Sequence, residues 1–445
     1  MIDWFKNLFR KERSTNNVKN YQALEAQRLI HQCEGESDWI YLSRHRNGFV
    51  REVAVRTLSE NPSAEALTAI LERLNDWVPV IREVAANTLE AYLSTHSSGD
   101  LLKLLTQLIS LSKKERVDHS KMVKRIQEVL VQAESINETK LAFATSRGDS
   151  ARFLFSTLWP VVREAPIPFL LDALGHPDTT VRQQALQRSA ELRPEDAIRV
   201  LEIALDNSNS IVRSRALYAW LPLANDRSHR IETSLLDASP GVRSVALWAS
   251  KKYRIDPRVV LERRVKGTPP NRKIEWLGVL GLAKQIDSVL ISPLLSDALK
   301  HPAPTVRAIA LELSDQGHEV LLAALDDPAT RVVKLAGGLL HEQPWEAISE
   351  HVTHRLEDWH SLPELQRKTL FALLPKWQQL DFLMSRVNGT GIDAYWLRTI
   401  VLWTQEQYQV VDPITPKLRR NAILGKLQEF ELSGLIPVGS VHRLS

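Results

Sequence analysis

The sequence predicts an all-α protein folded as a right-handed α-solenoid of helical hairpins. Three observations lead to this prediction. Glycine is scarce, with 17 residues in a chain of 445, whereas the good helix formers Leu, Ala, Arg and Glu are abundant. A motif of Val or Ile, then Arg, two variable residues and Ala recurs at intervals of about 31 residues. A short polar turn precedes each copy, as expected where one helix leads into the next.

The composition limits the class of protein further. Hydrophobic residues make up 44% and charged residues 25% of the chain, which excludes wholesale disorder. The net charge of +4 is too small for a protein that coats nucleic acid nonspecifically. A single cysteine, Cys33, excludes an intrachain disulfide and a Cys-rich zinc cluster. This usage fits a reducing compartment, so we expect a cytoplasmic protein.

Residues 1–20 are expected to form an amphipathic N-terminal arm and a linker. Such a helix suits a membrane surface or the groove of a partner protein, and it also suits a cap packed on the chain's own first repeat. The chain has no apolar stretch of about 18 residues and no signal peptide, so contact with lipid would be peripheral, at the inner face of the membrane. Apolar and basic side chains share the arm: Trp4, Phe5, Leu8 and Phe9 with Lys6 and Arg10.

Residues 21–345 carry the repeats. In each unit, a helix with apolar residues at helical spacing leads into a turn rich in Asp, Ser, Thr, Asn and Pro, which cap or begin the second helix. The second helix starts with the motif, whose alanine lies where two helices approach closely. An isolated hairpin could not bury its apolar face, so neighbouring units must stack. The motif arginines, called the ladder arginines below, are Arg51, Arg82, Arg182, Arg213, Arg243 and Arg307.

The turn followed by Val-Arg-x-x-Ala resembles the HEAT-repeat family, in particular the short bacterial HEAT-like repeats of the phycobilisome-lyase type. Clear copies cover 47–58, 76–89 and 175–340, whereas 110–158 and 264–283 keep helical periodicity without the motif. In that family, the turn aspartate and the helix arginine form a ladder between adjacent repeats. The resemblance therefore implies a structural role for the ladder arginines and says little about function. The pairs it suggests are Asp76 with Arg82, Asp206 with Arg213 and Asp237 with Arg243.

Residues 346–445 lack the motif and are expected to form a divergent helical cap that closes the apolar end of the array. This region is rich in tryptophan. Within the repeats, Trp220, Trp248 and Trp276 follow one another at intervals of 28 residues. Tryptophans that recur with a repeat either line one binding face or pack between helix pairs, and the sequence leaves both readings open.

No pattern in the sequence assembles a catalytic or cofactor site. The chain has no GxSxG, no GxGxxG and no GxxxxGK followed by Ser or Thr. Two His-Glu pairs, beginning at His318 and His341, resemble the repeated pairs of the deoxyhypusine hydroxylases, a HEAT-like di-iron family. Here both pairs fall in one half of the chain, and no partner carboxylate completes a recognisable set. We expect no catalytic residue, no metal and no cofactor.

Residues 251–273 form a basic patch. Nine cations stand against Asp256 and Glu262, a local charge of +7 in a chain of +4. Beside Trp248 and Trp276, this patch could bind a phosphate backbone and stack bases, as in the HEAT-like alkylpurine DNA glycosylases. A solvated face or a protein-docking patch is the alternative, and a second basic stretch at 113–125 makes the patch less unusual. Its cations are Lys251, Lys252, Arg254, Arg258, Arg263, Arg264, Lys266, Arg272 and Lys273.

These observations predict a noncatalytic scaffold or adaptor. It would bind another protein along the concave face of the solenoid and be recruited through its N-terminal arm, because extended arrays offer large surfaces and no catalytic set is assembled. The alternative is a HEAT-like nucleic-acid-binding protein with a DNA-repair activity of the alkylpurine glycosylase type.

Overall fold

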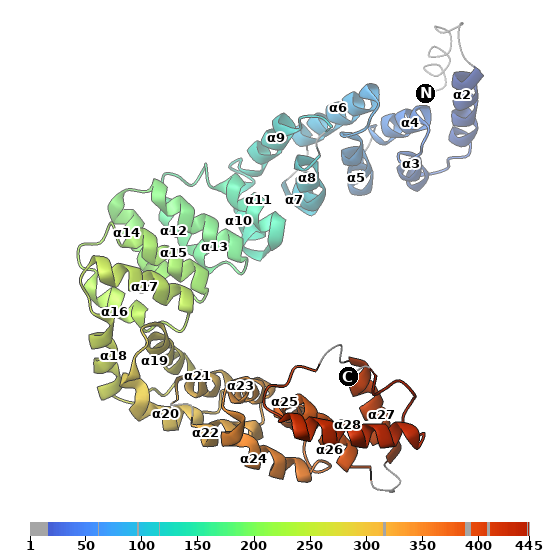
Figure 1. Ribbon diagram of the computed structural model, residues 1–445. Coiled ribbons are helices and arrows are strands. Elements are labelled where there is room, and N and C mark those ends of the chain that lie inside the picture. Colours follow the sequence, from blue (N-terminus) through green and yellow to red (C-terminus); the bar gives the residue numbers. More distant parts are fainter. Residues whose placement is uncertain are drawn as a thin grey trace. The chain divides into compact units, whose positions relative to one another are not determined.

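The protein divides into two compact helical units, Met1–Ala224 and Asn225–Ser445 (Figure 1). Every regular element among the described residues is a helix, which confirms the prediction of an all-α solenoid. The arm residues Trp4, Phe5, Lys6, Leu8, Phe9 and Arg10 lie outside the described residues. The structure is a computed structural model that describes residues 17–60, 62–95, 98–114, 116–314, 317–387, 393–406, 410–442 and 444.

The first unit is built from short helices joined by tight turns. Its helices are α2 (Asn17–Ile30), α3 (Glu36–Leu42), α4 (Gly48–Leu58), α5 (Ala64–Arg73), α6 (Pro79–Thr95), α7 (Ser98–Lys103), α8 (Leu105–Ser112), α9 (Ser120–Leu130), α10 (Ile136–Thr145), α11 (Gly148–Leu158), α12 (Pro166–Gly175), α13 (Thr179–Arg188), η1 (Ser189–Glu191), α14 (Pro194–Leu205) and α15 (Ser210–Trp220).

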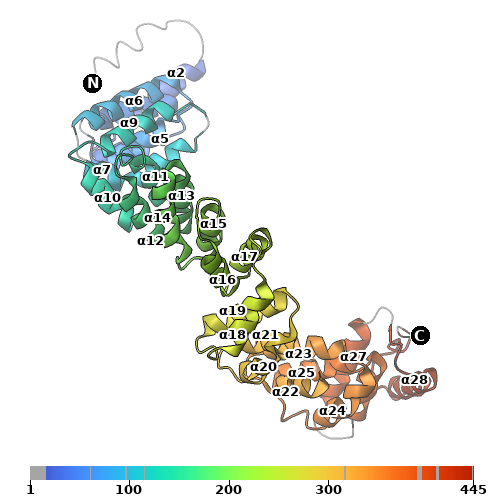
Figure 2. The ribbon, with the colours of Figure 1, turned by 90° about the vertical axis from the view of Figure 1, so that its left-hand side faces the viewer.

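These helices form hairpins that stack in two layers. Within a hairpin the two helices pack on each other, as in the pairs α3–α4, α5–α6, α12–α13 and α14–α15. Between hairpins, first helices contact first helices, such as α3 with α5 and α12 with α14. Second helices likewise contact second helices, such as α4 with α6 and α13 with α15. The stack of α12 to α15 can be followed in Figures 1 and 2.

The apolar residues of the motif form the centre of the stack. The Val or Ile and the Ala are four positions apart and therefore share one face of the helix. In α4, Val50 and Ala54 are fully buried, and α6 buries Ile81 and Ala85 in the same way. The small alanine lets the neighbouring helix approach closely. The same positions are fully buried in later helices: Val181, Ala185, Val212, Ala216, Val306 and Ala310.

The polar turns begin the second helices. The side chains of Asn47, Asp178 and Asn209 accept hydrogen bonds from backbone N–H groups in the first turns of α4, α13 and α15. These bonds satisfy donors that have no partner within the helix. In the second unit, Pro240 and Pro304 occupy the first helical positions of α17 and α21, where the missing N–H costs nothing.

The second unit repeats this design over a longer series of helices. Its helices are α16 (Ser228–Leu235), α17 (Pro240–Lys252), α18 (Pro257–Lys266), α19 (Lys273–Gln285), η2 (Val289–Ile291), α20 (Ser292–Leu299), α21 (Pro304–Leu313), α22 (His318–Ala323), η3 (Ala324–Asp326), α23 (Thr330–His341), α24 (Trp345–Glu357), α25 (Glu364–Leu373), α26 (Lys376–Ser385), α27 (Asp393–Glu406) and α28 (Lys417–Leu432).

One layer of this unit is the series α19, α21, α23 and α25, in which each helix packs on the next. α19 lies so close to the end of α16 that a Cβ at Gly278 would come within 2.0 Å of the Leu236 carbonyl oxygen. Only glycine permits this approach. A single hydrophobic cluster runs from Ala308 to Ile436. The last repeats therefore share a core with residues 346–445, whose role as a cap stays a prediction.

The tryptophans serve mainly as core residues. Trp220 and Trp276 are buried, whereas Trp248 is 46% exposed. In the C-terminal region, Trp359, Trp377, Trp396 and Trp403 are all buried. Interior packing therefore accounts for most of the tryptophans to which the sequence drew attention, and one repeat tryptophan is left at the surface.

An aspartate secures the C-terminal helices. Asp412 accepts hydrogen bonds from the backbone N–H of Trp377 at the start of α26 (2.9 Å) and from the hydroxyl of Thr415 (2.7 Å). Burial alone would raise the pKa of Asp412, but the bonds from Thr415, Trp377 and Ile414 outweigh it and hold the pKa below its usual value. Among the described residues, no helix is long and apolar enough to cross a membrane.

Candidate functional site

The ladder arginines share one contact inside the hairpin. Each donates a hydrogen bond to the backbone carbonyl six positions earlier, in the turn before its own helix. Arg51 donates to His45 at 2.9 Å, and Arg307 donates to His301 at 2.7 Å. These bonds satisfy turn carbonyls that would otherwise lack a partner. The same contact joins Arg82 to Asp76, Arg182 to His176, Arg213 to Asn207 and Arg243 to Asp237.

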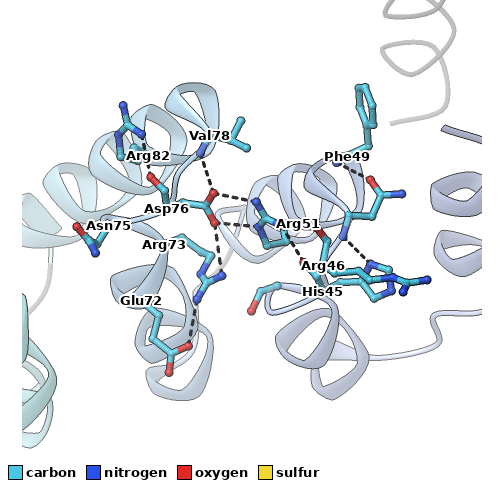
Figure 3. A network of polar contacts seen from close by, with 12 residues as sticks. His45, Arg46, Phe49, Arg51, Glu72, Arg73, Asn75, Asp76, Val78 and Arg82 are labelled. Atoms are coloured by element: carbon cyan, nitrogen blue, oxygen red, sulfur yellow. Dashed lines mark hydrogen bonds and ion pairs between the residues drawn. The ribbon is translucent and has the colours of Figure 1, made fainter. Parts of the chain in front are cut away.

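The second contact of a ladder arginine reaches the turn of the next hairpin. Arg51 donates to both carboxylate oxygens of Asp76, at 2.9 Å each. Arg307 holds Asp327 in the same way, at 2.6 and 2.7 Å. Two parallel bonds between a guanidinium and a carboxylate form a strong, directional pair. In the first unit this pair joins α4 to the turn between α5 and α6 (Figure 3).

The expected pairing of Asp76 with Arg82 is wrong. Arg82 binds only the backbone carbonyl of Asp76, at 2.8 Å, and the carboxylate goes to Arg51. One carboxylate oxygen also accepts the N–H of Val78 at 2.9 Å. Figure 3 shows the carboxylate lying between Val78, Arg51 and Arg73. The aspartate thus links its turn to the preceding hairpin instead of to its own helix.

The other two suggested pairs also differ in detail from the expectation. Asn207, and not Asp206, occupies the turn position before Arg213, and its side chain accepts the N–H of Asn209 at 2.9 Å. This amide also accepts a hydrogen bond from Arg182 of the preceding hairpin at 3.2 Å. Arg243 binds the backbone carbonyl of Asp237 at 2.7 Å.

Arg243 takes an unusual partner across the hairpins. Its Nε donates to the side chain of Gln285, at the end of α19, at 2.6 Å. The guanidinium lies against Gly281, where a Cβ would come within 2.3 Å of it. Burial is the main cause that lowers the pKa of Arg243, against the charge of Asp237. A glutamine and a glycine therefore replace the turn aspartate at this step.

One ladder arginine is missing from the sequence analysis. Arg152 in α11 pairs with Asp178 of the next turn at 3.2 Å. It escaped notice because Ala151 replaces the motif valine and Phe155 replaces the alanine. The spacing of 30 residues between Arg152 and Arg182 is the signal that could have revealed it.

The charges of the ladder pairs shift the aspartate pKa values downward. The hydrogen bond from Arg307 is the main cause for Asp327, and burial opposes it only in part. For Asp76, burial would raise the pKa, but the hydrogen bonds from Arg51 and Val78, with the nearby charges of Arg51 and Arg73, outweigh it. Both carboxylates are therefore ionised at neutral pH.

A surface cavity of about 610 Å³ opens beside the Arg51–Asp76 pair. We call it the turn groove, because the α3–α4 turn, the α5–α6 turn, α8 and the loop after α8 line it. Its ionisable lining comprises six cations and two carboxylates, a net charge of +4. These residues are Arg44, Arg46, Arg51, Arg73, Lys114 and Arg116 with Glu72 and Asp76.

Arg73 links the two carboxylates of the groove. It lies 3.5 Å from Glu72 and 3.4 Å from Asp76. Glu72 is also held by Arg44, with contacts of 2.8 and 2.9 Å. Burial is the main cause that lowers the pKa of Arg73, and the charges of Arg51 and Arg44 add to it. Three arginines thus share two carboxylates at the centre of the groove.

The sequence did not point to this groove. Its cations are spread from Arg44 to Arg116, and they meet only because consecutive turns stack. The partial signal was the basic stretch 113–125, from which Lys114 and Arg116 line the groove. Trp77, which follows the turn aspartate, is 64% exposed and also lines it.

The basic patch is partly neutralised in three dimensions. Arg263 pairs with Glu232 of α16 at 2.8 Å, and Lys266 pairs with Glu262 at 2.6 Å. Glu275 of α19 binds Arg272 at 2.7 Å and Arg264 at 3.5 Å. Two of these acids, Glu232 and Glu275, come from outside the span. The remaining cations of the patch are Lys251, Lys252, Arg254, Arg258 and Lys273.

An aromatic pair borders these remaining cations. The ammonium of Lys252 lies 5.3 Å from the ring centroid of Trp248 and 5.5 Å from that of Tyr253. A cation over an aromatic face is stabilised by the ring quadrupole. Trp276, the other tryptophan expected beside the patch, is buried. One exposed tryptophan therefore accompanies the patch instead of two.

The histidines do not gather into a metal site in the described part of the chain. The rings of His318 and His351 lie 6.5 Å apart, centroid to centroid. Within the described residues, no group of three or more His, Cys, Asp or Glu side chains is arranged to hold a metal ion.

Comparison with known families identifies the repeats. Residues 156–220, from the end of α11 through α15, match the family model described as HEAT repeats. The chain therefore contains HEAT repeats, as the motif predicts, and the assignment to the phycobilisome-lyase type stays a prediction. No curated protein matches the chain significantly.

Several known structures are similar in chain path at low sequence identity. One is a homology model of the full-length AP-3 complex in an intermediate open conformation, with 11% identity, 94% of this chain and 81% of that chain covered, and a TM-score of 0.26. A crystal structure of an engineered protein gives 15%, 89%, 98% and 0.21. The karyopherin Kap121p bound to the extreme C-terminus of the protein phosphatase Cdc14p gives 13%, 95%, 55% and 0.28. At such TM-scores, the fold assignment depends on the chain's own helices and repeats.

Proposed function

We propose that this HEAT-repeat protein is a noncatalytic scaffold that binds another protein on the surface of its helical array. Stacked hairpins place successive turns side by side, which gives an extended surface without a deep catalytic pocket. The observation that carries the proposal is the turn groove. It is a surface cavity within the range of about 300–1,000 Å³ that binding sites occupy, and its lining carries surplus positive charge.

Cross-linking and mass spectrometry on the full chain, purified from its own cells, test this proposal. Lys113 and Lys114, both exposed beside the groove, provide reactive amines at the site. We expect one protein in stoichiometric amount, cross-linked at these lysines. A chain that purifies alone at every ionic strength, with no cross-links to another protein, would contradict the proposal.

Recruitment through residues 1–13 is part of the same proposal. The arm would place a cytoplasmic protein at the inner face of the membrane or in the groove of a partner. Deletion of residues 1–14 tests this role, with localisation of a fluorescent fusion and co-purifying proteins as the two readouts. If neither changes, the arm does not recruit the protein.

Nucleic-acid binding is the second candidate, and one observation favours it. Lys251, Arg254 and Arg258 are exposed cations near the exposed Trp248, where a phosphate backbone and a base would both find partners. Charge reversal at these three positions should abolish duplex binding in a mobility-shift assay. Binding should also weaken steeply with salt. Absence of a shift at low salt removes this candidate, and a base-release assay on alkylated DNA tests the glycosylase activity.

A further inference from the structure

We propose that the turn groove binds an acidic peptide segment of the partner protein. The inference rests on the proposed scaffold function and names the chemistry that this part of the surface would recognise. Its occupant would carry carboxylates for the surplus cations, backbone amides for unpaired polar atoms and an apolar side chain for Trp77.

Charge is the first argument. The carboxylates of Glu72 and Asp76 already hold three arginines, so they cannot neutralise the rest of the lining. Arg46, Lys114 and Arg116 add three further cations, and all three side chains are exposed. Guanidinium groups prefer planar carboxylates, to which they donate two parallel hydrogen bonds. The surplus of positive charge therefore favours a ligand with several carboxylates.

Unpaired polar atoms are the second argument. Within the described residues, three buried side-chain atoms at the groove have no hydrogen-bond partner: Nε of Arg73, Oδ1 of Asn75 and Oε1 of Gln107. A buried polar atom without a partner costs about 1–3 kcal/mol. The first atom is a donor and the other two are acceptors. A peptide backbone supplies both complements, whereas the phosphate groups of a nucleic-acid backbone supply acceptors alone.

Trp77 is the third argument. Its ring is 64% exposed at the lining of the groove, and the guanidinium of Arg51 lies 5.3 Å from the ring centroid. This contact fixes the ring from one side because Arg51 is itself held by Asp76 at 2.9 Å. An exposed tryptophan held in one orientation is a suitable platform for an apolar side chain. The ligand is therefore an acidic peptide that also carries one large apolar residue.

Fluorescence anisotropy with the full chain tests this proposal. The probe is a fluorescein-labelled peptide of glutamates around one leucine, and the competitors are the same peptide with glutamine for glutamate and a single-stranded oligonucleotide. The double variant Arg46→Glu and Lys114→Glu reverses two exposed groove charges. The matched control, Lys251→Glu and Arg254→Glu, makes the same change in net charge on the basic patch of the second unit.

We expect the groove variant to weaken binding of the acidic peptide at least about tenfold and the control variant to leave it unchanged. Trp77→Ala should weaken it by a smaller factor, and the glutamine peptide should not compete. Unchanged circular dichroism melts verify that the variants fold. Three results overturn the proposal: no binding at low salt, equal losses in the groove and control variants, or stronger competition by the oligonucleotide than by the acidic peptide.

The two proposals fail in different ways. If a stoichiometric protein still cross-links to the chain but the acidic peptide does not bind, the peptide proposal is wrong and the scaffold proposal survives. If the peptide binds in the groove and no protein accompanies the chain in cells, the groove chemistry is right and the scaffold role is wrong.

Discussion

Replacement of Arg51 by alanine measures what the ladder contributes to stability. The Arg51 side chain is 3% exposed and the Asp76 side chain 1%. The change removes two hydrogen bonds to Asp76 and frees the carbonyls of His45 and Arg46. Asp76 keeps only Arg73 as a cationic partner, at 3.4 Å. Removal of one partner from a buried ion pair costs about 3–5 kcal/mol, and we expect a loss of this size.

The same groove offers a matched control. Arg44 contacts Glu72 with nearly the same two-bond geometry, at 2.8 and 2.9 Å, but the two side chains are 54% and 39% exposed. Arg44→Ala should therefore cost only about 0–1 kcal/mol. Urea denaturation followed by circular dichroism gives both values, and hydrogen exchange over α4 and α6 locates the loss. Equal losses in the two variants would refute the argument that burial makes the ladder pair important.

Three other changes test the remaining structure. The pKa values of the ladder aspartates and of Asp412 are held below normal, so their stabilising contribution is complete above about pH 4 and is lost as pH falls through the lowered values; the urea midpoint should drop accordingly. Gly281→Ala should destabilise the second unit by about 1–3 kcal/mol, because its Cβ would meet the Arg243 guanidinium at 2.3 Å. Gly338→Ala, where nothing lies within 4 Å, is the control in thermal melts and should stabilise by up to about 1 kcal/mol. Asp412→Ala should cost about 2–3 kcal/mol in the same melts, because it removes the hydrogen bond to Trp377 at 2.9 Å; a smaller loss than that of Gly338→Ala would contradict it.

The fold could be predicted because the motif states its own geometry. Two apolar positions four residues apart face one side of a helix, and a repeat near 31 residues leaves room for one hairpin. Val50 and Ala54 are fully buried for this reason, as are Val212 and Ala216. The degenerate copy with Arg152 was missed because its apolar positions hold Ala and Phe.

The partners of the arginines could not be predicted from spacing. Arg82 lies six positions after Asp76 and Arg51 lies 25 before it, and both bind it. Sequence proximity favours the first contact, but the carboxylate direction is set by its bond to Val78. The same limit applies to the basic patch, because Glu232 and Glu275 lie outside the span that the charge count covered.

The turn position six residues before each ladder arginine explains how one fold can carry different surfaces. Its side chain accepts the backbone N–H two residues later, and its carbonyl accepts the arginine, whichever acceptor the side chain is. Histidine does this at His45 and His301, aspartate at Asp76 and asparagine at Asn207, with N–H contacts of 2.9–3.2 Å. Because the fold needs only an acceptor at this position, the charge of each turn can vary without loss of the hairpin. The turn groove follows from this freedom: His45 contributes no carboxylate, so the cations around it remain in surplus for a ligand.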